Sequence, residues 1–395
     1  MSKRRVAILG CSGSVGTQAC SILNEHRDQF EVVLLAAHTA SAALGELAAR
    51  HRPGAACLTG PAVAPALPVG TQFSAGADGL LRALAASAPD TVLNAITGAA
   101  GLAASEWTLR HGRTLALANK ESLVIAGAFL MPLAQQSGAR ILPVDSEHCA
   151  IFQCLDGEAP TSVRKIWLTG SGGPFRTRSL ATFGAITPTE ALQHPTWTMG
   201  PRITIGSATM MNKAFEVLEA HWLFDLAPER IEVVLHPQSI VHSMVEFIDG
   251  SILAQCGVPD MRVPILFCLG YPERLPFAGF APFDPRRWRN LEFTAFEPDR
   301  YPAVPLAYEV LRQGGDAGAR LNAADEVATA AFLNHRIPFA AITACSQQVL
   351  ALRPARAIAS LQDVLDADAE ARQQAQAMLA TWPVTAATTT PSGSN

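Results

Sequence analysis

The sequence predicts an α/β protein in three parts: an N-terminal doubly wound, Rossmann-like domain built on a parallel sheet, a second, α/β catalytic domain, and a C-terminal helical domain. Three patterns support this class. Short apolar runs alternate with helix-like stretches over the first 139 residues, a glycine-rich turn follows the first run, and helical periodicity dominates after residue 306. The predicted divisions are 1–139, 140–270, a proline-rich connector over 271–305, 306–383, and a disordered tail over 384–395.

The composition disfavours several classes of partner. The 395 residues carry a formal net charge of -4 without a block of like charges, so neither nucleic acid nor a membrane surface is expected to bind. No apolar stretch reaches transmembrane length, and the N-terminus has no signal-peptide core. The eight cysteines contain no Cys-x-x-Cys pair, which predicts reduced thiols in the cytoplasm rather than a disulfide framework.

A glycine-rich turn follows the first predicted strand and precedes a helical stretch. Its spacing over residues 10–16 is G-x-x-G-x-x-G. Glycines let the backbone turn tightly and approach a pyrophosphate, which the amides at a helix N-terminus can bind. A dinucleotide site is therefore predicted at Gly10, Ser12, Gly13, Ser14 and Val15.

The second predicted strand, residues 31–36, bears on the choice of cofactor. An NAD site usually has Asp or Glu after this strand to bind the ribose hydroxyls, and the sequence has neither there. A 2′-phosphate is thus tolerated, so NADPH is the predicted cofactor, with His38 and Thr39 as candidate donors to that phosphate.

Two further strands are predicted at 91–96 and 114–118. Ligands of open α/β sheets collect at the carboxyl ends of the strands. The loops that follow, including Asn119, Lys120 and Glu121, are therefore expected to border the nicotinamide cleft.

Two polar stretches predict a metal site beside a substrate cradle. Asp145 and Glu147 are expected on an extended segment, where alternate side chains share a face. Asn212 and Glu216 are expected one turn apart on a helix, with Lys213 between them. The three carboxylates form an all-oxygen ligand set that suits Mg²⁺ or Mn²⁺ better than zinc. Each stretch alone is also consistent with an acidic turn or an ordinary amphipathic helix.

The second domain contains two loops of interest and a group of strands. Residues 170–176 form a glycine-rich turn that could hold an anion, and residues 194–200 have the composition of a loop that closes over an active site. Strands are predicted at 165–169, 233–235, 240–248 and 251–255, the last two as a hairpin.

Seven motifs together resemble the 1-deoxy-D-xylulose 5-phosphate reductoisomerase family over nearly the whole chain. Any one of them could match by chance, but seven in one order rarely do. They are the glycine turn, Asn-Lys-Glu-Ser at 119–122, Asp-Ser-Glu at 145–147, and the stretches 168–176, 194–200, 207–216 and 236–244.

The resemblance implies an enzyme of isoprenoid precursor biosynthesis by the methylerythritol phosphate pathway. Members rearrange 1-deoxy-D-xylulose 5-phosphate by retro-aldol cleavage and re-addition, and reduce the resulting aldehyde with NADPH to 2-C-methyl-D-erythritol 4-phosphate. A divalent cation would act as a Lewis acid on substrate oxygens. The resemblance also implies a homodimer.

Residue roles follow from the same resemblance. The implied catalytic residues are Lys120, Asp145, Glu147 and Glu216, of which the three acids would bind the metal. The implied substrate-binding residues are Lys120, Ser146, Glu147, Ser171, His194, Trp197, Ser207, Asn212, Lys213 and Glu216. Asn119, Glu121 and Gly200 would join the glycine turn, His38 and Thr39 around the cofactor.

The chain departs from the family pattern at several positions, of which Gly206 and Phe215 adjoin the substrate cradle. Gly206 stands where Asp is usual, Phe215 replaces Leu, and Asp325 stands for Asn. These changes leave open a paralogue that acts on a different small phosphorylated sugar. Two other classes also remain: a phosphorylating aldehyde dehydrogenase, which would need a nucleophile such as Cys149, and a non-catalytic dinucleotide-binding sensor.

Overall fold

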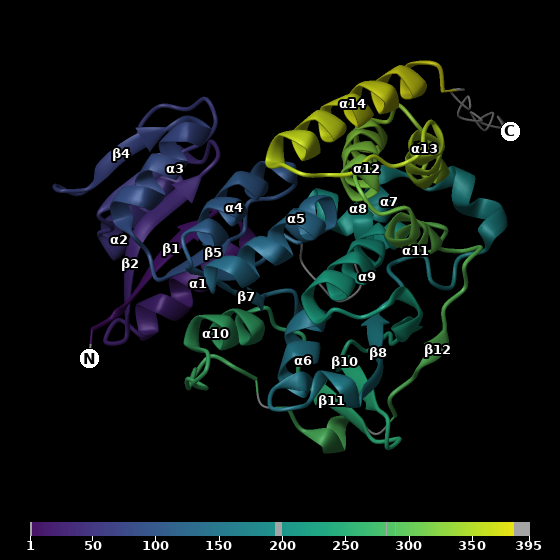
Figure 1. The fold of residues 1–395 in the computed structure, drawn as a ribbon, viewed down its shortest axis with the longest axis horizontal. Helices are drawn as coiled ribbons and strands as arrows, with labels where there is room; N and C mark the ends of the chain where they lie inside the picture. The colour runs from purple at the N-terminus through teal and green to yellow at the C-terminus, as the bar shows by residue number, and fades with distance from the viewer. Residues whose placement is uncertain (1, 194–199, 282, 289, 383–395) are drawn as a thin grey trace, which may run out of the picture.

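Two sheets and a group of C-terminal helices make up the molecule (Figure 1). The computed structural model describes residues 2–193, 200–281, 283–288 and 290–382. The helix α9 (Met211–Phe224) packs against α5 (Glu121–Ser137) on one side and against α11 (Ala303–Gln313) on another, so it joins all three parts. The predicted three-part α/β fold is confirmed.

The first sheet is entirely parallel, with the strand order β4-β3-β2-β1-β5-β6-β7. Its elements are β1 (Arg4–Leu9), α1 (Ser14–Glu25), β2 (Phe30–Ala37), α2 (Ser41–His51), β3 (Ala55–Leu58), β4 (Gln72–Ala75), α3 (Gly76–Ser87), β5 (Thr91–Asn94), a 3-10 turn η1 (Ala99–Gly101), α4 (Leu102–Arg110), β6 (Thr114–Leu117), α5 and β7 (Arg140–Pro143).

The strand order reverses between β1 and β5, which places a crevice at the carboxyl ends of these two strands. The two faces of the sheet are covered by different helices. Buried residues of α1, α2 and a later helix, α10 (Arg262–Gly270), form one core with the sheet, while α3 and α4 form the other. The inner strands β1, β2, β3 and β5 are largely buried on both faces, and for that reason they read as apolar runs, whereas the edge strand β4 is mostly exposed.

The second sheet is mixed and has the order β11-β10-β8-β9-β12. The predicted hairpin is present, since β10 and β11 pair antiparallel. The elements of this region are α6 (Ser146–Leu155), η2 (Pro160–Ser162), β8 (Val163–Gly170), η3 (Leu180–Ala185), α7 (Pro188–Ala191), α8 (Pro201–Thr209), α9, η4 (Pro228–Arg230), β9 (Ile231–Leu235), β10 (Val241–Phe247), β11 (Ile252–Cys256), α10, η5 (Pro285–Arg287) and β12 (Thr294–Ala295).

The C-terminal region is helical, as the periodicity predicted. It comprises α11, α12 (Ala317–Leu333), α13 (Ala340–Ala351) and α14 (Leu361–Ala380). Helix α12 packs on α13, α14 and α5, and its alanine-rich surface lets these helices approach closely. A Cβ on Gly318 would lie 2.0 Å from the carbonyl oxygen of Val124, so the α12–α5 contact requires glycine at that position.

Elements on either side of the predicted domain boundaries at residues 140 and 271 belong to the layers of the first sheet. Strand β7 starts at residue 140 but completes the first sheet, and α10, which precedes residue 271, covers that sheet. Within the predicted connector, β12 adds a short strand to the second sheet. The predicted tail over 384–395 lies outside the described residues. Among the residues that are described, no helix has both the length and the apolar character needed to cross a membrane.

Candidate active site

The glycine turn lies where the sequence predicted it: residues 10–13 follow β1, and residues 14–16 form the start of α1. Gly10 has φ +79°, and a Cβ there would lie 2.5 Å from the carbonyl oxygen of Ala95. A Cβ on Gly16 would lie 2.3 Å from the carbonyl oxygen of Gly10. Because neither position has room for a side chain, the turn holds α1 tightly against β1 and β5.

A cleft of about 210 Å³ opens beside this turn. It is lined on one side by Gly13, Ser14 and Val15, and on the other by Gly200 and residues of α8 and α9. The loops after β5 and β6 also line it. The cleft is thus bounded by the glycine turn, by two loops of the first sheet and by residues of α8 and α9.

The other predicted cofactor residues have different environments. Ser12 is half-buried in the turn, while His38 and Thr39 are exposed after β2, with His38 Nδ1 3.1 Å from the Thr59 hydroxyl. Asn119 is buried, and its amide donates to the carbonyl of Gly98 at 2.9 Å. The Asn119 side chain therefore holds the loop after β5 in place. Glu121 lines the cleft.

The structure corrects the predicted extended segment at residues 145–147. The strand ends at Pro143, Asp145 is the N-cap of α6, and Glu147 lies in its first turn. An Asp followed two residues later by Glu is a common helix start, and this signal outweighed the alternation read as a strand. Asp145 makes no capping hydrogen bond, because its carboxylate faces Lys120 instead.

The three predicted metal ligands converge. Asp145, Glu147 and Glu216 each offer a carboxylate oxygen, and these oxygens lie within 4.8 Å of one another. Lys120 pairs with Asp145 and lies 3.2 Å from Glu216 Oε1. Lys213 lies 2.8 Å from Glu147 Oε1 and also pairs with Glu216. Three carboxylates and two ammonium groups thus form one network at the start of α6 and of α9.

Burial and charge set the protonation of this network. Burial, with help from the charge of Glu147, raises the pKa of Glu216 to about 7. Burial acts to raise the pKa of Glu147 as well, but Lys213 outweighs it and lowers that pKa to about 2. Although burial opposes their charge, the carboxylates raise the pKa of both Lys120 and Lys213, so both stay ammonium ions.

A second cleft, of about 400 Å³, lies above the carboxylates and shares Ser14, Lys120 and Gly200 with the first. Its lining includes the predicted substrate residues Lys120, Ser146, Glu147, Ser171, Ser207, Asn212 and Lys213, together with Asp145. Glu216 lies beneath it, fully buried, and accepts hydrogen bonds from Asn212 and both lysines. His194 and Trp197 lie outside the described residues.

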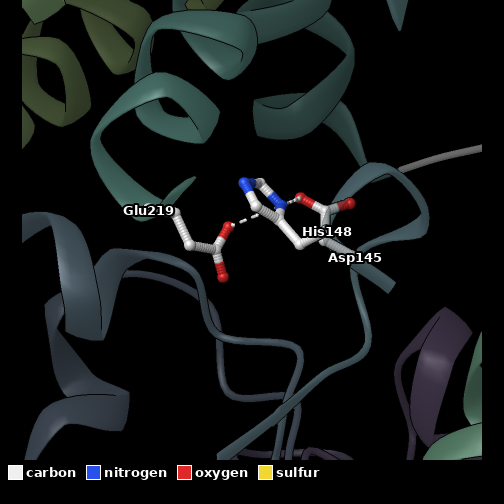
Figure 2. A group of neighbouring side chains, drawn as sticks. All are labelled: Asp145, His148 and Glu219. Atoms are coloured by element: carbon white, nitrogen blue, oxygen red, sulfur yellow. Dashed lines mark ion pairs between the residues drawn. The ribbon is translucent and has the colours of Figure 1, made fainter. Parts of the chain in front are cut away.

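A second acidic layer behind these ligands was missed in the sequence. His148 Nδ1 lies 3.2 Å from Glu219 and 4.0 Å from Asp145, and Figure 2 shows the imidazole between the two carboxylates. Its Nε2 donates to the main-chain carbonyl of Glu216 at 2.9 Å. On the predicted strand, Asp145 and His148 would face opposite ways, whereas three residues apart on a helix they meet.

Burial determines the protonation of His148 and Glu219. Burial lowers the pKa of His148 to about 4, so the ring is neutral, and its one proton is on Nε2. Burial also raises the pKa of Glu219 well above its usual range. Glu219 is therefore a protonated acid whose Oε2 lies 3.2 Å from His148 Nδ1, although neither that nitrogen nor the Glu219 oxygens have a hydrogen-bond partner among the described residues.

The environment of Cys149 argues against the aldehyde dehydrogenase alternative. Its thiol is buried in the core between α6 and the first sheet, away from both clefts. A cysteine nucleophile must reach a bound substrate.

Three positions that depart from the family pattern, Gly206, Phe215 and Asp325, all line the smaller cleft. Asp325 is buried on α12, and burial raises its pKa to about 7. The charge of Arg202 lowers that pKa, while those of Glu326 and Glu121 raise it. Asp325 is therefore a partly ionised acid inside the protein.

Asp325→Asn is expected to stabilise the protein more as the pH rises. Because the folded-state pKa of about 7 exceeds the unfolded value of about 4, the wild type loses stability between these two pH values, on the order of a few kcal/mol. The variant lacks this loss. Denaturant unfolding of both proteins at pH 5 and pH 8 should show a larger gain at pH 8, and an equal difference at both would contradict the raised pKa.

Comparison with known proteins identifies the family. Three family models match, described as 1-deoxy-D-xylulose 5-phosphate reductoisomerase over residues 6–127, 1-deoxy-D-xylulose 5-phosphate reductoisomerase C-terminal domain over 141–224, and DXP reductoisomerase C-terminal domain over 256–374. A 1-deoxy-D-xylulose 5-phosphate reductoisomerase of Xanthomonas euvesicatoria is 46% identical over 387 residues, which cover 96% of this chain and 98% of the relative. One of Paraburkholderia xenovorans is 45% identical over 96% of this chain and 97% of the relative.

Solved structures agree with this assignment. The Zymomonas mobilis 1-deoxy-D-xylulose 5-phosphate reductoisomerase in complex with NADPH matches with a TM-score of 0.88 and 40% identity, over 96% of this chain and all of that one. A DOX-P reductoisomerase in complex with NADPH, fosmidomycin and magnesium matches with a TM-score of 0.87 and 36% identity, over 95% and 98% of the two chains. This chain therefore belongs to the 1-deoxy-D-xylulose 5-phosphate reductoisomerase family.

Proposed function

We propose that this enzyme converts 1-deoxy-D-xylulose 5-phosphate to 2-C-methyl-D-erythritol 4-phosphate with NADPH and Mg²⁺ or Mn²⁺, in isoprenoid precursor biosynthesis. One observation carries the proposal. Three carboxylates converge with two lysines at a cleft that shares residues with the glycine turn. The substrate must reach the carboxylate network for skeletal rearrangement and the cofactor at the glycine turn for reduction, without leaving the protein. The shared cleft allows that.

The carboxylate set fits a divalent cation. Asp145, Glu147 and Glu216 offer oxygens close enough for joint ligation, and hard oxygen donors suit Mg²⁺ and Mn²⁺. With all three acids ionised and both lysines protonated, the network has a net charge of -1, which favours a cation. When bound, the metal ion supplies Lewis-acid stabilisation of negative charge that develops on substrate oxygens as a carbon–carbon bond breaks.

The lysines would then serve the substrate. Lys120 and Lys213 each pair with two carboxylates of the set, and both line the larger cleft. Metal ligation by those carboxylates would weaken the ion pairs and leave the ammonium groups able to bind an anionic substrate. We assign Lys213 to the phosphate end and Lys120 to the reacting carbons, beside the cofactor cleft that it also lines.

The remaining polar residues hold the substrate. We propose that Ser171, Ser207 and Asn212 bind the phosphate and adjacent hydroxyls, and that Ser146 binds the carbonyl end, since all four line the larger cleft. Fixing both ends of a small, flexible sugar lowers the entropic barrier to reaction. His194 and Trp197 are assigned to the phosphate and to the loop that closes over it, on the family motif alone.

A metal-dependence assay tests the proposed activity. NADPH oxidation followed at 340 nm with 1-deoxy-D-xylulose 5-phosphate should stop after removal of divalent ions with EDTA and return with Mg²⁺ or Mn²⁺. Activity without any divalent ion would exclude the metal. Oxidation of NADPH with another sugar phosphate, and none with this one, would exclude the proposed substrate.

We also infer a cytoplasmic homodimer. All eight cysteines are free, and seven are buried, as is usual in a reducing compartment. Strand β11 is the edge of the second sheet and exposes Ile252 and Leu253, which a second copy could cover. The family resemblance supplies the choice of a dimer.

A further inference from the structure

Arg202 lies at a junction of three parts of the chain. Its Nη1 is 2.8 Å from Glu121 Oε1 and 3.0 Å from Glu326 Oε1, and its Nη2 donates to Asn322 Oδ1 at 2.9 Å. Asp325 Oδ2 lies 4.0 Å from the same Nη2. Arg202 comes from α8, Glu121 from α5 and the other three from α12, so one guanidinium ties three helices together.

This group, termed the Arg202 junction, is enclosed and fixed. The side chains of Arg202, Glu121 and Glu326 are 21%, 10% and 18% exposed. A Cβ on Gly98 would lie 2.6 Å from Glu326 Oε1 and 3.1 Å from Arg202 Nη1, so the loop after β5 packs directly on the ion pair. Glu326 is held from its other side by Arg372 of α14. The planar guanidinium presents its donors in a fixed arrangement, so the Arg202 side chain loses little conformational freedom when it bonds to these acceptors. One geometry is therefore favoured.

The junction connects the two halves of the active site. Glu121 directly follows Lys120, and Arg202 is the second residue of α8, the helix that carries Ser207. The cofactor cleft lies between them, because Ser14, Lys120, Glu121 and Arg202 all line it. A shift of α8 relative to α5 would therefore change the distance between the substrate residues and Lys120.

We propose that Arg202 is a positioning residue for the reductoisomerase reaction, which holds α8 and its substrate-binding serine in register with the Lys120 loop through Glu121 and Glu326. Without the guanidinium, Glu121 and Glu326 would be two enclosed carboxylates facing each other, and Asp325 would add a third acid. Their repulsion would separate α5 from α12 and α8. Arg202 does not need to touch the substrate for this effect.

The inference rests on the proposed function, and four variants test it: Arg202→Met, Arg202→Lys, Glu326→Gln and the double variant Arg202→Met/Glu326→Gln. The matched control is Arg312→Met, which removes an exposed i,i+3 pair with Glu309 on α11. Each protein is assayed for kcat, for KM of both substrates and for melting temperature. Arg202→Met should lower kcat by about tenfold or more, as expected for a lost contact between coupled neighbours.

Three results together would support the positioning role. Arg202→Lys, which keeps the charge but not the fork, should recover part of kcat. The kcat of the double variant should lie closer to that of Arg202→Met than the product of the two single-variant effects on kcat would give, because removing one carboxylate relieves the repulsion. Arg312→Met should match the wild type in every measurement.

Several results would overturn it. They are an unchanged kcat in folded Arg202→Met, a lower melting temperature with unchanged kinetics, and independent effects of Arg202→Met and Glu326→Gln. Should Arg202→Met not fold, Arg202→Lys and Glu326→Gln decide, since the proposal requires a lower kcat in both. An inactive wild type would refute the proposed activity, whereas an active wild type with these results would refute the positioning role alone.

Discussion

Glu216→Gln is expected to lower kcat by at least about a hundredfold, because a charged ligand worth several kcal/mol of transition-state stabilisation is replaced by a weak one. Glu216 is fully buried and is bonded by Asn212, Lys120 and Lys213, so a glutamine of the same size has a ready place. Removing a buried carboxylate with a raised pKa should not destabilise the fold. Binding of NADPH, measured by fluorescence, should change little.

The matched control for this variant is Glu219→Gln, three residues further along the same helix. Glu219 is equally buried, but its raised pKa keeps it protonated, so an uncharged amide of the same size replaces an uncharged acid there. It should therefore retain most of the activity. If Glu216→Gln turned over like Glu219→Gln, the helix carboxylate would have no part in metal binding. Partial recovery of Glu216→Gln at high Mg²⁺ would instead locate the defect in cation affinity.

The fold could be predicted from local patterns because those patterns are strong. Parallel strands buried on both faces read as short apolar runs, and the steric demand at Gly10 and Gly16 makes the turn after β1 visible in the sequence. The division of the chain was harder to predict. Helix α10 follows the second sheet in sequence but covers the first, and no local signal marks a helix that returns to an earlier domain.

The sequence predicted the site residues that a motif identifies by their chemistry. It missed the residues that only the three-dimensional arrangement brings together. The convergence of Asp145, Glu147 and Glu216 followed from their chemistry even though the first two were assigned to a strand instead of a helix start. That error hid the contact between His148 and Glu219, which forms only because the first residue lies on helix α6 and the second on helix α9. The Arg202 junction joins residues that lie 81 and 120 positions from Arg202 in the sequence, so only tertiary packing reveals it.

Lys120→Met is expected to lower kcat by at least about a hundredfold, since a positioned charge at developing negative charge is typically worth this much. Methionine has nearly the length of the lysine stem, so the packing around this buried residue should survive. The lost ammonium group pairs with Asp145 and Glu216 and lines both clefts. Steady-state kinetics and NADPH binding would measure the effect. Lys165→Met, at a half-buried lysine that pairs with Glu232 on the second sheet, is the control.

The metal affinity distinguishes this variant from Glu216→Gln. Removing Lys120 makes the carboxylate set more negative by one charge, so Mg²⁺ or Mn²⁺ should bind as well as in the wild type or more tightly. Turnover should stay low at every metal concentration, whereas Glu216→Gln should lose metal affinity and turnover together. Weaker metal binding in Lys120→Met would place the lysine among the groups that shape the cation site. A normal kcat would remove it from the chemistry, because the ammonium group would then only neutralise Asp145 and Glu216 in the free enzyme.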